Sequence, residues 1–164
     1  MRSRTPRVVA LAWLVGSLLE GLTGCAAPPR AGRPPAYLPE LGEIMAATQM
    51  RHLKLWYAGE ARSWALASYE VDELEEGFAD AVRFHPTHKQ APRPLAEILP
   101  EFVDGPIQAL RTAIAEQRKA EFEAAYGLLT QACNGCHAAT GFSFIVVKGP
   151  DRNPYTNQHF DPPK

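Results

Sequence analysis

Apolar side chains recur at helical spacing through most of the chain and predict four helices. The first helix begins after Pro39 and ends near Gly59. Its polar face carries Glu43, Arg51 and Lys54, so the opposite face can be buried. That apolar face consists of Leu41, Ile44, Met45, Thr48, His52, Leu55 and Trp56.

A second amphipathic helix follows, with Ser63 as its expected N-cap and His85-Pro86 as its end. The segment 87–94 contains two prolines and no apolar run, which indicates a loop. The apolar stripe of this helix consists of Trp64, Ala67, Val71, Leu74, Phe78 and Val82.

The third helix is the least regular, because proline removes a helical hydrogen bond and clashes with the preceding turn. Pro100 and the pair Gly105-Pro106 interrupt the pattern. We therefore expect a short piece around 95–99 and a main run through Ile107, Leu110 and Ile114.

The fourth helix is the most regular. Phe122, Tyr126, Leu129, Cys133 and His137 follow one another at intervals of four, three, four and four residues, so they share one face. Four amphipathic helices with short connections predict an all-α fold, an antiparallel up-down-up-down four-helix bundle.

The fourth helix also carries the sequence Cys133-Asn134-Gly135-Cys136-His137, and C-x-x-C-H is the attachment sequence of a c-type haem. Two thiols about one turn apart can add across the vinyl groups of a porphyrin, and the adjoining histidine can bind the iron. We expect one covalent haem c, bound by Cys133 and Cys136, with His137 as the proximal iron ligand. The haem would face the bundle interior near the C-terminal end of the fourth helix.

Other uses of two such cysteines are less consistent with the sequence. A structural zinc site needs four ligands, and the remaining cysteine, Cys25, lies far upstream. A thioredoxin-type redox pair belongs at the start of a helix that follows a strand. A plain disulfide between Cys133 and Cys136 is the main remaining alternative.

The N-terminal residues have the pattern of an export signal. Arg2, Arg4 and Arg7 precede an apolar run at 8–19 that is too short to span a bilayer comfortably. The sequence Leu22-Thr23-Gly24-Cys25 resembles the bacterial lipobox, which predicts lipidation of Cys25; an ordinary secretory signal with a stray cysteine is the alternative. We expect a periplasmic protein that is lipid-anchored to a bacterial membrane without a transmembrane helix.

These features divide the chain into four parts. They are a lipoprotein signal peptide at 1–24, a proline-rich tether at 25–38, a haem domain at 39–140 and a C-terminal tail at 141–164. Removal of 1–24 changes 17 basic and 18 acidic residues to 14 and 17, a net charge of about −3 with neutral histidines. This charge gives no indication of nucleic-acid binding.

The bundle and the motif late in its fourth helix together resemble the class II cytochromes c, the cytochrome c-prime group. The resemblance covers roughly residues 39–140 and concerns architecture and motif placement; the pentapeptide is its specific part. It implies a haem held by Cys133, Cys136 and His137. The chain departs from the group in its lipobox and in its tail, which is apolar enough near Phe142 to cover a haem edge or to dock on a partner.

The second axial position of the iron would decide between functions, because an open position binds gases and a filled one favours electron transfer. In an antiparallel bundle the end of the fourth helix lies beside the first two turns of the first. Met45 meets that condition, and low-spin members of the resembled group use a methionine from the first helix. His52 is an alternative ligand about 10 Å further along the helix, Met50 lies at the edge of the polar side, and Met45 as a core residue is the plain alternative.

The sequence therefore predicts a one-electron carrier and no enzyme, since no catalytic constellation accompanies the motif. The alternative is a sensor or scavenger of nitric oxide or carbon monoxide with a vacant distal site; a subunit of a larger redox complex is a third possibility. Expected partners are a periplasmic or membrane redox protein and the membrane itself, and a second copy of the chain is a further candidate. The remaining histidines, His85, His88 and His159, are assigned no role.

Overall fold

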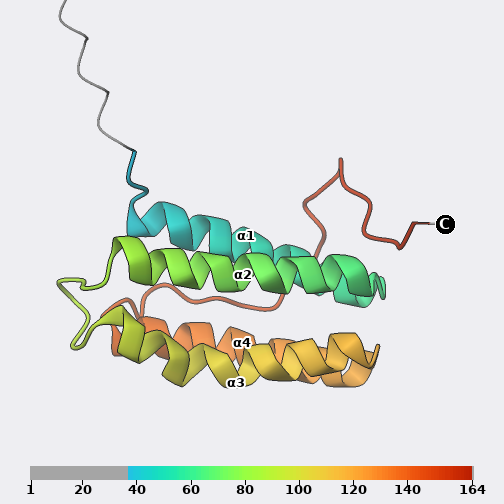
Figure 1. Ribbon diagram of the computed structural model, residues 1–164. Helices are drawn as coiled ribbons and strands as arrows, with labels where there is room; N and C mark the ends of the chain where they lie inside the picture. The colour runs from blue at the N-terminus through green and yellow to red at the C-terminus, as the bar shows by residue number, and fades with distance from the viewer. Residues whose placement is uncertain (1–36, 164) are drawn as a thin grey trace, which may run out of the picture. The chain divides into compact units, whose positions relative to one another are not determined.

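The computed structural model describes residues 37–163, which form four α-helices and no strand. The helices are α1 (Leu41–Glu60), α2 (Trp64–Phe84), α3 (Leu95–Ala115) and α4 (Lys119–Ala139). Figure 1 shows α1 paired with α2 in one layer and α3 paired with α4 in the other. The predicted all-α four-helix bundle is confirmed.

The signal peptide, Cys25 and most of the predicted tether fall in 1–36, outside the described residues. Among the helices that the structure describes, none has the length and apolar character needed to cross a membrane.

The helix ends show how local chemistry sets the boundaries. At the start of α1, the carboxylate of Glu43 accepts the backbone N–H of Glu40, forming one half of a capping box. At the start of α2, Ser63 occupies the predicted N-cap position, but its side chain makes no capping hydrogen bond, so that part of the prediction is wrong. Ser63 is buried, and its backbone N–H instead donates to the carbonyl of Ala58 in the turn that closes α1.

The third helix corrects the sequence prediction of an interrupted element. α3 runs without a break through Pro100 and Pro106. Each proline costs about 3 kcal/mol in a helix interior, whereas each large apolar side chain contributes about 1.5–3 kcal/mol when buried. Burial outweighs the two prolines because seven such side chains of α3 are buried: Leu95, Ile98, Leu99, Val103, Ile107, Leu110 and Ile114.

The predicted face of α4 supplies the centre of the core. Phe122, Tyr126 and Leu129 are almost completely buried. The backbone of α1 approaches this face so closely that a Cβ at Gly59 would lie 2.0 Å from Cε1 of Phe122. Glycine at this position therefore permits the contact between the two helices.

The segment after α4 is an ordered part of the same unit as the bundle. Tyr155 lies under the ammonium group of Lys54, with 5.1 Å from Nζ to the ring centroid. Phe160 is buried, and its ring centroid lies 5.6 Å from that of Tyr57 in α1. The tail thus contacts the first helix as well as the last, in keeping with its course in Figure 1.

Candidate functional site

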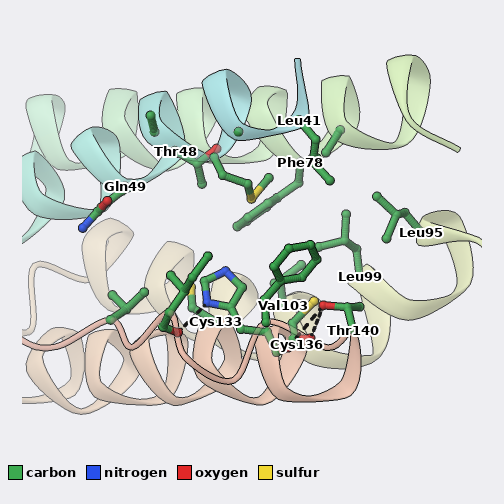
Figure 2. A pocket seen from close by; sticks show the side chains of 18 of the residues that line it. Leu41, Thr48, Gln49, Phe78, Leu95, Leu99, Val103, Cys133, Cys136 and Thr140 are labelled. Carbon is green, nitrogen blue, oxygen red and sulfur yellow. Dashed lines mark hydrogen bonds between the residues drawn. The ribbon is translucent and has the colours of Figure 1, made fainter. Parts of the chain in front are cut away.

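A cavity of about 390 Å³ lies between the two helix layers, bounded by all four helices, the α2–α3 loop and the tail. Its volume falls within the roughly 300–1,000 Å³ typical of ligand and cofactor sites. Its walls are mostly apolar. Figure 2 shows them as Leu41, Thr48 and Gln49 from α1, Phe78 from α2, Leu95, Leu99 and Val103 from α3, and Cys133, Cys136 and Thr140 from α4.

The three reactive residues of the pentapeptide, Cys133, Cys136 and His137, all line this cavity. Both thiols are free and half-buried. Burial raises the pKa of Cys133 to about 11 and also raises the pKa of Cys136. A dithiol redox centre requires the opposite, a thiolate stabilised at low pKa near a helix N-terminus.

The imidazole of His137 is oriented by one hydrogen bond. Its Nδ1 lies 3.1 Å from the carbonyl oxygen of Ile145. Because a carbonyl can only accept, the hydrogen sits on Nδ1, and Nε2 keeps its lone pair in the neutral ring. That is the tautomer that a histidine needs in order to bind a metal through Nε2.

Gly135 allows α3 to pass close to the pentapeptide. A Cβ at this position would lie 2.8 Å from Cε1 of Phe102. The absent side chain leaves room for the Phe102 ring beside the segment that carries the two thiols. The pentapeptide therefore lies in a closely packed part of the α3–α4 contact.

Met45 in α1 lines the same cavity as His137 in α4. The structure thus brings the thioether proposed as a distal ligand and the imidazole proposed as a proximal ligand to one space, from two different helices. Met50 is 37% exposed and is not part of the lining.

His52 also lines the cavity, but both of its ring nitrogens have hydrogen-bond partners. Nδ1 lies 2.9 Å from the hydroxyl oxygen of Tyr126, and Nε2 lies 3.0 Å from Oγ1 of Thr130. Since Thr130 donates its own hydroxyl hydrogen to the carbonyl of Tyr126, it accepts from Nε2–H of His52. Nδ1 is then the acceptor for Tyr126. Burial lowers the pKa of His52 to about 4, so the ring is neutral.

The cavity includes residues that the sequence prediction left without a role. His88, in the loop between α2 and α3, lines it and lies 5.3 Å from the ring of Phe142, centroid to centroid. No periodicity marks a loop residue, so no sequence signal identified it. His85 instead contacts the carbonyl of Pro39 through Nε2 at 2.8 Å, and His159 is exposed beside Asp161.

The tail residues Phe142, Ile145 and Val147 also line the cavity. Their apolar character was visible in the sequence, but their position was not. They form part of the cavity wall.

Within residues 37–163, no group of three or more His, Cys, Asp or Glu side chains is arranged to hold a metal ion. A haem iron does not need such a group, because the porphyrin supplies four of its ligands. The donor set of this cavity is the one that a c-type haem needs: two thiols and one imidazole, whose Nδ1 is held by a carbonyl, border a mostly apolar cavity.

Comparisons of the chain with protein-family models, with curated proteins and with solved structures found no match. The function of this chain must therefore be inferred from the site itself.

Proposed function

We propose that this protein is a c-type cytochrome that binds one covalent haem and transfers one electron in the bacterial periplasm, where a lipid on Cys25 anchors it. One observation carries the proposal: Cys133, Cys136 and His137 border a single apolar cavity that Met45 also lines from the opposite layer. A C-x-x-C-H sequence that arose by chance would not be expected to border such a cavity.

In this proposal Cys133 and Cys136 would hold the haem covalently, and His137 would bind its iron through Nε2. The haem, when bound, supplies one-electron redox chemistry at its iron. The apolar wall formed by Leu95, Leu99 and other side chains excludes water, which lowers the local dielectric constant and limits the reorganisation that accompanies a change of charge.

Hydrogen bonding supports Met45 over His52 as the sixth ligand. His52 would have to give up a buried hydrogen bond to Tyr126 or Thr130 before either nitrogen could bind iron. Loss of a partner in a buried pair costs about 1–3 kcal/mol. The Met45 thioether is at most a weak hydrogen-bond acceptor, so binding iron would not break a comparable bond.

The resemblance to the class II cytochromes c agrees with this proposal. The confirmed four-helix bundle is the architecture of that group, and the pentapeptide lies near the C-terminal end of α4 as the resemblance requires. A plain disulfide between Cys133 and Cys136 is the competing assignment. It would explain neither the cavity nor the orientation of His137.

Covalent haem is the decisive test. The chain would be produced in cells with a working haem-attachment system and extracted with acidified organic solvent, which removes non-covalent haem. The parent should keep its chromophore, whereas Cys133→Ala and Cys136→Ala should each weaken attachment and the double variant should lose it. Cys25→Ser is the matched cysteine control and should keep covalent haem. A parent without covalent haem rejects the proposal.

A further inference from the structure

The tail turns back along α4 immediately after the pentapeptide. Gly141 has a φ of +83°, a left-handed conformation that glycine adopts without a steric penalty. The N–H of Phe142 donates to the carbonyl of His137 at 2.7 Å, and the N–H of Gly141 contacts the carbonyl of Ala138 at 3.4 Å. This is a Schellman motif, and it reverses the chain at the end of α4.

The returning segment is attached to α4 at two points about one helical turn apart. At the first, the carbonyl of Ile145 accepts Nδ1–H of His137. At the second, the side-chain amide of Asn134 makes two hydrogen bonds with the backbone of Val147. Nδ2 of Asn134 donates to the carbonyl at 2.8 Å, and Oδ1 accepts the N–H at 2.7 Å.

Side chains along this segment have different environments. Phe142, Ile145 and Val147 line the cavity, although Ile145 is also 46% exposed. Phe144 and Val146 are 75% and 73% exposed. The segment therefore separates part of the cavity from solvent, and the amide of Asn134 holds the backbone in the register that brings the carbonyl of Ile145 to His137.

We propose that residues 142–147 form a strap that positions the proximal ligand His137, and that Asn134 is the positioning residue that fixes this strap. The inference rests on the proposed function, since a ligand imidazole needs an iron. It goes further by assigning a role to Asn134, one of the two variable positions of the attachment sequence, and to the tail.

The physical basis is the strength of the imidazole as a donor. A histidine whose Nδ1–H is held by a carbonyl acquires more negative character on Nε2 and binds oxidised iron more strongly. Loss of the strap should therefore favour the reduced state and raise the reduction potential. Outer-shell partners of metal ligands typically change affinity 10–100-fold when removed.

The test compares Asn134→Ala with the parent, both as full-length protein carrying haem. Alanine has a high helix propensity, so the substitution should not disrupt α4. Asn157→Ala is the matched control, because Asn157 is an exposed tail residue beyond the strap. Two quantities are measured: hydrogen exchange of the Val147 amide and the reduction potential.

In Asn134→Ala, exchange of the Val147 amide should become at least tenfold faster. The equilibrium constant for reduction should rise about tenfold, which is about 59 mV for one electron. Asn157→Ala should change neither quantity. Unchanged protection of Val147, or a loosened strap with an unchanged potential, overturns the inference. If the parent itself carries no covalent haem, the proposed function is rejected instead. The two results are therefore distinguishable.

Discussion

The hydroxyl oxygen of Tyr126 lies 2.9 Å from Nδ1 of His52, a residue that lines the cavity. Tyr126 is almost completely buried and His52 is 4% exposed, so neither group can exchange its partner for water. Burial also raises the pKa of Tyr126, which keeps its hydroxyl protonated as a donor. The pair fixes a neutral histidine inside the bundle.

A neutral buried histidine makes stability depend on pH. The pKa of His52 is about 4 in the folded protein, against about 6.5 when unfolded. Between these values the unfolded chain binds more protons, so the contribution of His52 to stability is complete above pH 6.5 and is lost as pH falls toward 4. At pH 4.5 the loss should be about 2.5 kcal/mol.

Urea unfolding of the parent and of His52→Gln at pH 7.5 and 4.5 measures this effect, because other titrating groups cancel in the difference. His159→Gln, which alters an exposed histidine, is the control and should retain the full pH dependence of the parent. Equal pH dependence in the parent and in His52→Gln would show that the pKa of His52 is the same in the folded and unfolded states, which would contradict its burial as a neutral ring.

The sixth ligand can be read from visible absorption spectra. With Met45 on the iron, the oxidised protein should show a weak band near the red end from sulfur ligation, a low-spin reduced spectrum and slow uptake of carbon monoxide. Met45→Ala should become high-spin and bind carbon monoxide readily. Met50→Ala, a methionine outside the cavity, is the matched control and should retain the parent spectrum.

The opposite results assign the function differently. A parent that is already high-spin and binds carbon monoxide readily would favour the gas-binding alternative. A low-spin spectrum retained in Met45→Ala would transfer the ligand role to His52, and the potential provides a second test because methionine ligation raises it relative to a second histidine.

Replacement of two glycines by alanine should change the stability of the protein in opposite directions. At Gly59 a Cβ would lie between 2.0 and 2.6 Å from three atoms of the fully buried Phe122 ring, so Gly59→Ala should destabilise by about 3 kcal/mol. At Gly127 a Cβ would meet nothing within 4 Å, so Gly127→Ala should stabilise α4 by about 0.5–1 kcal/mol. Thermal unfolding of both variants measures the difference, and Phe122→Leu should partly rescue Gly59→Ala.

The lipid anchor can be tested at Cys25. Cys25→Ser should convert a membrane-associated protein into a soluble or unprocessed one, because the thiol would no longer carry acyl chains. Fractionation and mass determination of the N-terminal peptide would distinguish these outcomes. Unchanged membrane association in Cys25→Ser would remove the lipoprotein assignment and leave the cytochrome proposal intact.

The sequence predicted the helices because burial imposes a 3.6-residue period on each of them. The stripe from Phe122 to Leu129 is buried as expected. The same rule predicted too short a helix for α3, because proline is a local helix breaker. The burial of Leu99 and Val103 on either side of Pro100 depends on tertiary packing, which the local sequence does not show.

The candidate site was only partly predictable. Cys133 and His137 carry a specific spacing, and Met45 follows from helix order. The two hydrogen bonds between Asn134 and Val147 connect a helix to an irregular segment. Irregular backbone has no repeat that sequence could reveal, so neither this contact nor the place of His88 could be foreseen.

The two prolines of α3 also affect the motions of the cavity wall. Pro100 and Pro106 have no N–H to offer the carbonyls of Ala96 and Phe102, and Leu99 and Val103 line the cavity in the same stretch of helix. Two backbone hydrogen bonds are therefore missing from the stretch of α3 that forms the wall. Local opening, which begins where such bonds are fewest, should start in this stretch while the rest of the bundle stays closed. A small molecule could then reach the interior of the cavity without global unfolding.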